Sequence, residues 1–160
     1  MATTNLAGIA SPHRGWVSGD RRVTLLTVIL AASVLSTAMH FTHNYIEVRH
    51  YPQSSFLPIG YDGSRVLIAL GWPALTAVGA LGLWLYRRGT FPAAWVCLAA
   101  YSFTGISSLI HFIDGNPHVS PFWYATILTD ALAGVAVLGF VYAGVVYARA
   151  SSAARRISRA

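Results

Sequence analysis

The stretch VTLLTVILAASVLSTAMHFTHNY, residues 23–45, decides the fold class of this chain. It contains no Asp, Glu, Lys or Arg, and a helix of about 20 apolar residues is long enough to cross a bilayer. Three further apolar segments follow, at about residues 65–86, 91–113 and 122–148. The sequence therefore predicts an all-α integral membrane protein, built as a single bundle of four transmembrane helices.

The composition of the whole chain agrees with this class. Hydrophobic residues make up 55% of the sequence and charged residues only 10%, whereas an ordinary soluble domain has about 25% charged residues. All eleven basic residues are arginines, and they cluster at the ends of the apolar segments rather than along one face or arm. The pI of about 10.0 therefore indicates a lipid bilayer as the partner and not a nucleic acid.

The placement of the arginines also predicts the orientation. Nine of them lie before the first segment, between the second and third, or after the fourth, and these places share one side of a four-span topology. Because positively charged loops stay on the cytoplasmic side, both termini are expected in the cytoplasm, with the protein in the inner or plasma membrane of the cell. Residues 1–22 would then form a disordered cytoplasmic tail, residues 23–148 the transmembrane domain, and residues 149–160 a basic cytoplasmic tail. An alternative is that residues 20–26, DRRVTLL, belong to a twin-arginine export signal and that residues 1–38 are removed, which would leave three spans.

Small and polar residues gather on single faces of the predicted helices. Small residues recur at helical spacing, which lets helices approach closely, at Gly71, Gly79, Gly139 and Ala143. At about 100° per residue, one stripe of the first segment collects its polar side chains, which are Ser33, Ser36, Thr37, His40, His43, Asn44 and Glu47. Similar stripes on the third and fourth segments pass through His111 and Asp130. These faces are expected to look into the bundle, because bulky apolar side chains suit lipid.

Four ionisable side chains on these faces are expected at nearly one height. Counted from the cytoplasmic arginines at 1.5 Å per residue, His40 lies roughly 27 Å along its helix, and His111 and Asp130 lie roughly 28 Å along theirs. His43 lies about one turn higher. The four side chains would therefore converge near the extracytoplasmic face. An aspartate at the centre of a membrane span costs ~2.5 to 3.5 kcal/mol, which marks this cluster as a candidate functional site.

The histidine cluster and its carboxylate suggest a metal site. Neutral imidazoles and a carboxylate are common ligands of Zn²⁺, Cu²⁺ and Fe²⁺. We therefore predict a transition-metal site in which His40, His43 and His111 are ligands and Asp130 is either a ligand or the acceptor that orients one histidine. A metal-bound water in such a pocket would permit hydrolytic or redox chemistry. The sequence assigns no catalytic residue, so it does not decide whether the protein is an enzyme.

Other functions fit the same residues. A b-type haem held between His111 and either His40 or His43 would make a small electron-transfer bundle. The histidines and Asp130 could also exchange protons without any metal. In a purely structural alternative, the histidines mark helix ends and Asp130 pairs with Arg65. The non-enzymatic alternative is an accessory subunit of a larger membrane complex or a homo-oligomer, whose small-residue faces and pocket serve assembly or lipid binding.

Overall fold

The computed structural model describes residues 19–55 and 57–158, and these residues form helices and connections without any strand. In chain order the elements are α1 (Gly19–Ile46), η1 (Val48–His50), α2 (Gly60–Arg87), α3 (Phe91–Ile106), η2 (Ser107–Phe112) and α4 (Pro121–Ile157). The short turn η2 continues α3, and the resulting four helical stretches are each long and apolar enough to cross a membrane. The predicted all-α fold with four such helices is confirmed.

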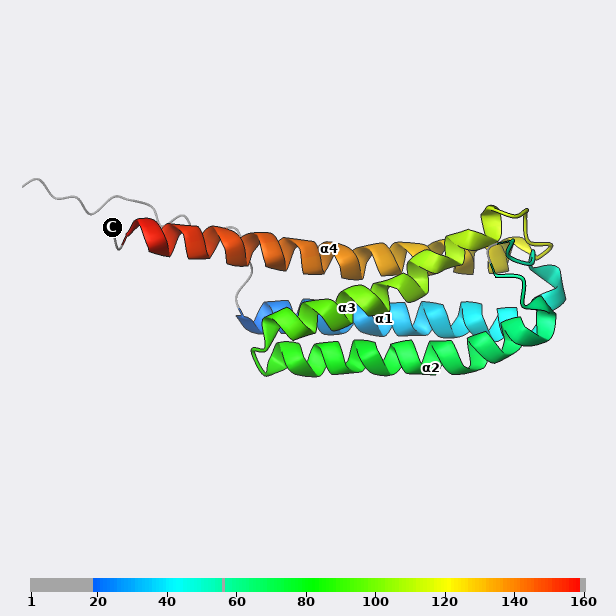
Figure 1. Cartoon of the computed structure of the whole chain (residues 1–160), viewed down its shortest axis with the longest axis horizontal. Coiled ribbons are helices and arrows are strands. Elements are labelled where there is room, and N and C mark those ends of the chain that lie inside the picture. Colours follow the sequence, from blue (N-terminus) through cyan, green and yellow to red (C-terminus); the bar gives the residue numbers. More distant parts are fainter. Residues whose placement is uncertain (1–18, 56, 159–160) are drawn as a thin grey trace, which may run out of the picture.

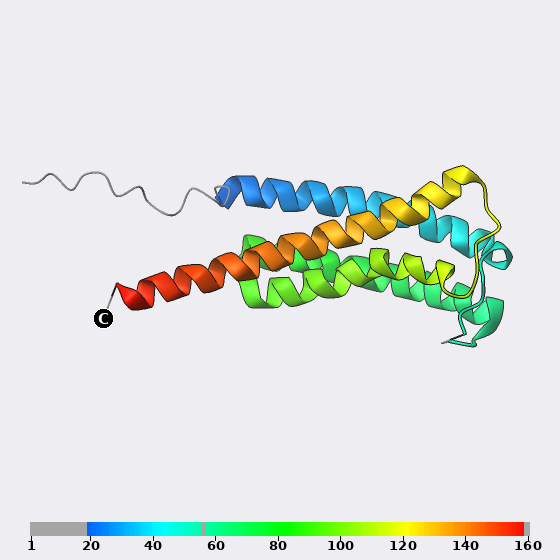
Figure 2. The ribbon, with the colours of Figure 1, turned by 90° about the horizontal axis from the view of Figure 1, so that it is seen from above.

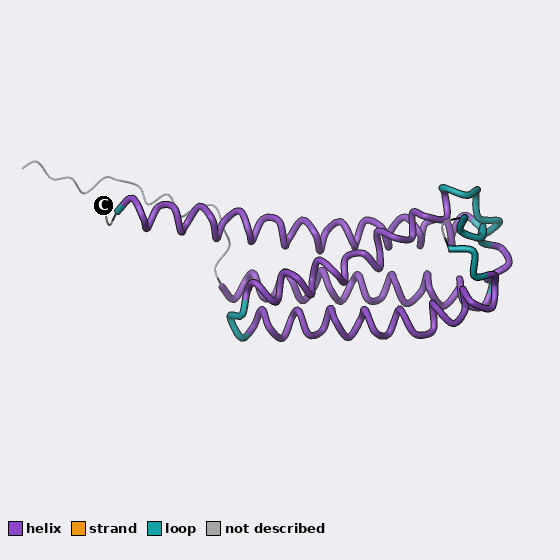
Figure 3. The backbone as a smooth tube through the Cα atoms, in the orientation of Figure 1, coloured by secondary structure: helices purple, strands orange, loops and turns teal. Residues whose placement is uncertain are grey.

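The four helices form an up-and-down bundle (Figures 1 and 2). α1 packs against α2 and α4, and α3 packs against the same two helices from the other side. At one end of the bundle α1 begins, α2 turns into α3 and α4 ends, and we call it the arginine end. At the opposite end, called the loop end, longer connections join α1 to α2 and η2 to α4 (Figure 3).

The last helix is longer than its apolar segment. Residues 149–157, expected to belong to a tail, continue α4 as far as Ile157, and Figure 1 shows this helix projecting beyond the others at the arginine end. Alanine and arginine are strong helix formers, which explains the extension. At the other terminus, Gly19–Arg22 form the first turn of α1, and the rest of the predicted tail, residues 1–18, lies outside the described residues.

Glycine and proline set the tight turn between α2 and α3. Gly89 has a φ of +76°, in the left-handed region that glycine adopts at little cost, so the chain can leave α2 there. Pro92 lies in the first turn of α3, where its missing N–H is not needed by the helix. The turn therefore holds α2 and α3 as antiparallel neighbours.

Two glycines bring α3 and α4 into backbone contact. An added Cβ on Gly105 would overlap the carbonyl oxygen of Asp130, and one on Gly134 would lie 2.6 Å from the carbonyl oxygen of Ser102. Gly79 makes a similar contact with the ring of Tyr101, as its spacing predicts. In contrast, an added Cβ on Gly139 would meet nothing within 4 Å. The close crossing at Gly105 and Gly134 sets η2 beside the first third of α4, where Ser108 contacts Asp130.

Candidate functional site

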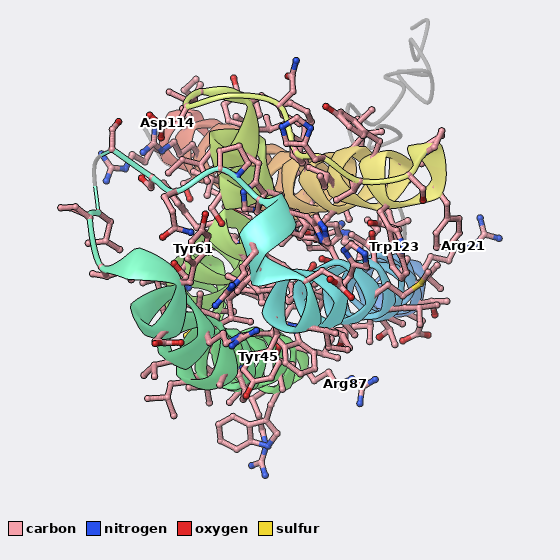
Figure 4. The ribbon with its side chains drawn as sticks, turned by 90° about the vertical axis from the view of Figure 1, so that its right-hand side faces the viewer. Arg21, Tyr45, Tyr61, Arg87, Asp114 and Trp123 are labelled. Atoms are coloured by element: carbon pink, nitrogen blue, oxygen red, sulfur yellow. The ribbon has the colours of Figure 1, made fainter. Side chains whose placement is uncertain are left out.

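A cavity of about 320 Å³ lies near the loop end, between α1, α2 and the α3–η2 helix. Most of its wall is apolar, with Leu67, Ile68 and Leu75 from α2 and Val48, Tyr51 and Leu57 from the α1–α2 connection. The polar part of the wall comes mainly from α1 and the α3–η2 helix, through His40, Asn44, Thr104, Ser107, Ser108 and His111. Figure 4 looks onto this end of the molecule, with Tyr61 on the side of α2 and Trp123 between α1 and α4.

Two of the predicted site residues meet in the wall of this cavity. The ring centroids of His40 and His111 are 5.4 Å apart, in an edge-to-face arrangement. The side-chain amide nitrogen of Asn44 lies 3.0 Å from Nε2 of His111. Because an amide nitrogen can only donate, Nε2 accepts this bond and the neutral imidazole carries its proton on Nδ1. We call His40 and His111 the imidazole pair.

Several buried polar atoms around the cavity lack partners. His40 is fully buried, and within the described part of the chain neither of its ring nitrogens has a hydrogen-bond partner. The same holds for Nε1 of Trp72 and the hydroxyl of Thr104, and all three residues line the cavity. Buried polar groups are nearly always hydrogen-bonded in native proteins, so such a concentration around one cavity calls for an explanation.

His43 lies outside this cavity. Its Nδ1 is 2.7 Å from the hydroxyl of Tyr51, and its ring stacks on Trp123 with the centroids 4.0 Å apart. The ring of Tyr51 also contacts His111, at a centroid distance of 4.7 Å. Tyr51 therefore stands between His43 and the imidazole pair.

Asp130 binds hydroxyl groups rather than histidines. It is fully buried, and its two carboxyl oxygens lie 2.8 Å from Oγ1 of Thr37 and 2.6 Å from Oγ of Ser108. These contacts join α1, η2 and α4 at one level, and we call Thr37, Ser108 and Asp130 the carboxyl junction. Thr37 also donates to the carbonyl oxygen of Ser33, and the Tyr101 hydroxyl donates to Oγ of Ser33. A buried polar network therefore ties the helices together beside the cavity.

The structural alternative, in which Asp130 pairs with Arg65, is not what the structure shows. Arg65 instead donates to the carbonyl oxygens of Tyr45 and Ile46 at the end of α1, over 3.2 and 3.5 Å. Its other neighbour is the carboxylate of Asp62, at 3.9 Å. A cation beside the last carbonyls of a helix is a favourable arrangement, so Arg65 caps α1 and does not reach the carboxyl junction.

The four predicted metal ligands are therefore divided among three places. His40 and His111 form the pair in the cavity wall, His43 lies against Tyr51 and Trp123, and Asp130 lies in the carboxyl junction. Across the residues that the structure describes, no group of three or more His, Cys, Asp or Glu side chains could hold a metal ion. The predicted four-ligand centre has no support in this arrangement.

The connections at the loop end are tied to each other. The backbone N–H and the hydroxyl of Ser55 both donate to the carboxylate of Asp114, over 3.0 and 2.5 Å. These bonds lower the pKa of Asp114, because they stabilise its charged form. The backbone N–H of His118 donates to the carbonyl oxygen of His50 over 2.8 Å. The α1–α2 and η2–α4 connections thus form one hydrogen-bonded cover.

Besides Trp72, whose indole lines the cavity, sequence reasoning missed Tyr51. Its position after η1 gives it no helical register with α1, so no spacing rule places its ring against the imidazole pair. An aromatic residue near a span end is also typical of the membrane interface, which conceals any other role. The only indication in the sequence that Tyr51 could reach the site is that it follows His43 by just eight residues.

The burial of Tyr51 gives a testable dependence on pH. Burial raises the pKa of Tyr51 to about 12, from an ordinary value of 10.0. A raised pKa stabilises the protonated folded state, so this contribution is fully present below pH 10 and is lost as the pH rises to about 12. We expect Tyr51→Phe to be about 1 kcal/mol less stable than wild type at pH 8, through loss of the bond to His43. Thermal unfolding in detergent should show this difference shrinking above pH 10, and a difference that stays constant would contradict the assignment.

Comparisons with family models, with curated proteins and with solved structures find no match for this chain. Its function is therefore argued from the site alone.

Proposed function

We propose that the four helices cross the cell membrane with both termini in the cytoplasm, so that the cavity lies near the extracytoplasmic side. The length and hydropathy of the helices support insertion. The clustering of arginines at one end supports the orientation, because positive residues are retained on the cytoplasmic side. In this placement the arginine end faces the cytoplasm and the loop end faces outward.

The function that the geometry supports best is binding of a lipophilic molecule with a polar, oxygen-bearing end. The cavity, about 320 Å³, falls within the usual range for small-molecule sites, which combine an apolar wall with a few placed polar groups. The apolar side chains of α2 would contact the body of the molecule. The imidazole pair, Trp72 and Thr104 would surround its polar end.

One observation carries this proposal, the unpaired polar atoms of His40, Trp72 and Thr104 in one cavity wall. A neutral imidazole has one donor and one acceptor, an indole has only a donor, and a hydroxyl can act as either. These groups together favour an oxygen that accepts hydrogen bonds, such as the carbonyl group of an ester, a ketone or a quinone. Binding would pair groups that are otherwise left unsatisfied in a buried environment.

A transition metal bound to the imidazole pair is the second candidate. The specific observation in its favour is that both nitrogens of His40 are unpaired beside the ring of His111. The pair offers two imidazoles in place of the predicted three and a carboxylate, and Nε2 of His111 would have to give up its bond to Asn44 to bind the metal. Zn, Cu or Fe would also need further ligands from solvent or from a bound molecule. A haem between these two histidines is less favoured, because rings in edge contact leave no gap for a macrocycle.

Removal of the unpaired groups one at a time tests the binding proposal. We expect the purified wild-type protein to carry a lipophilic compound that solvent extraction and mass spectrometry identify. Thr104→Val, Trp72→Phe and His40→Leu each remove polar atoms from the cavity wall while roughly keeping its volume. Each should weaken binding of the compound by about fivefold, because one hydrogen bond in such a site contributes about 1 kcal/mol.

The chain offers a matched control for these variants. The hydroxyl of Thr76 is also buried and without a partner among the described residues, but Thr76 does not line the cavity. Thr76→Val should therefore retain as much compound as wild type. Equal retention by Thr76→Val and Thr104→Val would contradict the proposal. Metal analysis of the same samples tests the second candidate, which requires a stoichiometric metal that is lost in His40→Leu.

A further inference from the structure

A second hollow lies at the arginine end, between α3 and α4, far along the bundle from the cavity described above. Trp95, Val96 and Ala99 of α3 and Val145 of α4 give it an apolar wall. The indole of Trp95 can lie against α4 because residue 144 is a glycine, where an added Cβ would come within 3.1 Å of Nε1. We call this hollow the α3–α4 groove.

Two arginines stand at the outer end of the α3–α4 groove. Arg149 and Arg156 both line it, together with Ser152. Ser152 follows Arg149 by three residues and Arg156 follows it by seven, which puts the three side chains on one face of α4. The two arginines are about two turns apart. This part of α4 belongs to the section that projects beyond the other helices (Figure 1). The groove is therefore amphiphilic, with an apolar inner part and a cationic outer part.

Among the residues that the structure describes, no carboxylate, including that of Asp20 at the same end, forms an ion pair with either of these arginines. The sequence contains five acidic residues, and four of them, Glu47, Asp62, Asp114 and Asp130, belong to the half of the bundle nearer the loop end. Asp20 is the remaining one, and it starts α1. Residues 1–18 contain no acid, so this terminal segment brings no negative charge to the groove.

We propose that the α3–α4 groove binds an anionic phospholipid. The guanidinium groups of Arg149 and Arg156 hold the phosphate-bearing headgroup, and an acyl chain lies along Trp95, Val96 and Val145. Arginine suits this task because its planar donor fork matches phosphate oxygens. Basic pockets between helices at the cytoplasmic side of a membrane favour anionic headgroups for the same electrostatic reason. The site requires that the helices cross a membrane, but it does not depend on what the cavity at the loop end binds.

The full-length protein, reconstituted in bilayers of phosphatidylcholine with a minor fraction of phosphatidylglycerol, provides the test. Native mass spectrometry would count the lipids that stay bound after release from the bilayer. We expect wild type to retain phosphatidylglycerol in preference to phosphatidylcholine. The double variant Arg149→Gln, Arg156→Gln should lose this preference by tenfold or more, since each basic residue near a membrane surface contributes separately.

A control variant with the same change of charge distinguishes binding of the lipid in the α3–α4 groove from general electrostatic attraction to the arginine end. Arg21 and Arg87 lie at the same end, on α1 and α2, and neither lines the groove. The double variant Arg21→Gln, Arg87→Gln should keep the preference of wild type. The proposal is overturned if wild type shows no preference for the anionic lipid, or if the two double variants lose it equally. Both pairs are exposed, and circular dichroism would verify that the helices are intact.

Discussion

Replacement of Gly105 by alanine is expected to lower the free energy of unfolding by about 3 kcal/mol, at the upper end of the usual cost of overpacking. The added methyl group would overlap the carbonyl oxygen of Asp130 and lie 3.0 Å from the backbone nitrogen of Gly134. Backbone atoms of a packed helix cannot rotate away as a side chain can. α3 and α4 would therefore have to separate, and the clash would strain the whole crossing.

The same separation would reach the candidate site. Ser108 lies one turn beyond Gly105, and its bond to Asp130 spans the two helices. We expect Gly105→Ala to lose this bond and to retain less of any compound bound in the cavity. Gly139→Ala is the matched control, because a methyl group there meets nothing within 4 Å and improves helix propensity by about 0.5 to 1 kcal/mol. Thermal unfolding in detergent would compare the two, and equal stability of both variants would contradict the close crossing.

Asp130→Leu is expected to lower the free energy of unfolding by about 2 kcal/mol, because the hydroxyls of Thr37 and Ser108 would lose their shared acceptor in a buried place. Thr37 keeps the carbonyl oxygen of Ser33 as a second acceptor. Ser108 has Asp130 as its hydrogen-bond partner, so most of the loss is expected from Ser108. Unfolding in mixed detergent would measure the change.

Removing the whole polar group should recover much of this stability. In Asp130→Leu combined with Thr37→Val and Ser108→Ala, no hydroxyl of the carboxyl junction is left unpaired, and replacing all partners by apolar groups can be nearly neutral. Arg65→Gln should lower stability only by the roughly 0.3 to 1 kcal/mol of a cation at a helix end, because Arg65 binds the end of α1 and not Asp130. If neutralising Arg65 rescued Asp130→Leu, the carboxyl junction would not be the environment of Asp130.

Hydropathy and helical periodicity predicted the helices that carry the site and which of their polar residues are buried. Ser33, Thr37, His40 and Asn44 are all buried, as the polar stripe on the first segment requires. Counting residues also placed His40 level with His111, and their rings are in contact. These successes share a cause, since the rise and the angle per residue are fixed properties of a helix and need no knowledge of its neighbours.

The partners of these residues could not be predicted in the same way. His43 lies about 60° around the helix from His40, so helical periodicity assigned both histidines to one face. This angle is nevertheless large enough to direct the ring of His43 to Trp123. The choice of Thr37 and Ser108 over Arg65 as partners of Asp130 depends on the crossing at Gly105, a contact between helices that neither helix encodes alone. Tyr51 comes from a connection, where no regular geometry applies.

The hydrogen-bonded cover at the loop end bears on how a molecule would enter and leave the cavity. The bonds that join Ser55 to Asp114 and His50 to His118 hold the two connections of this end together, and residues 51–54 of the first connection line the cavity. Among neighbouring helices, α1 and α2 pack least closely, and both line the cavity. In the proposed membrane placement, the contact between α1 and α2 is therefore where we expect a lipophilic molecule to pass between the cavity and the surrounding lipid.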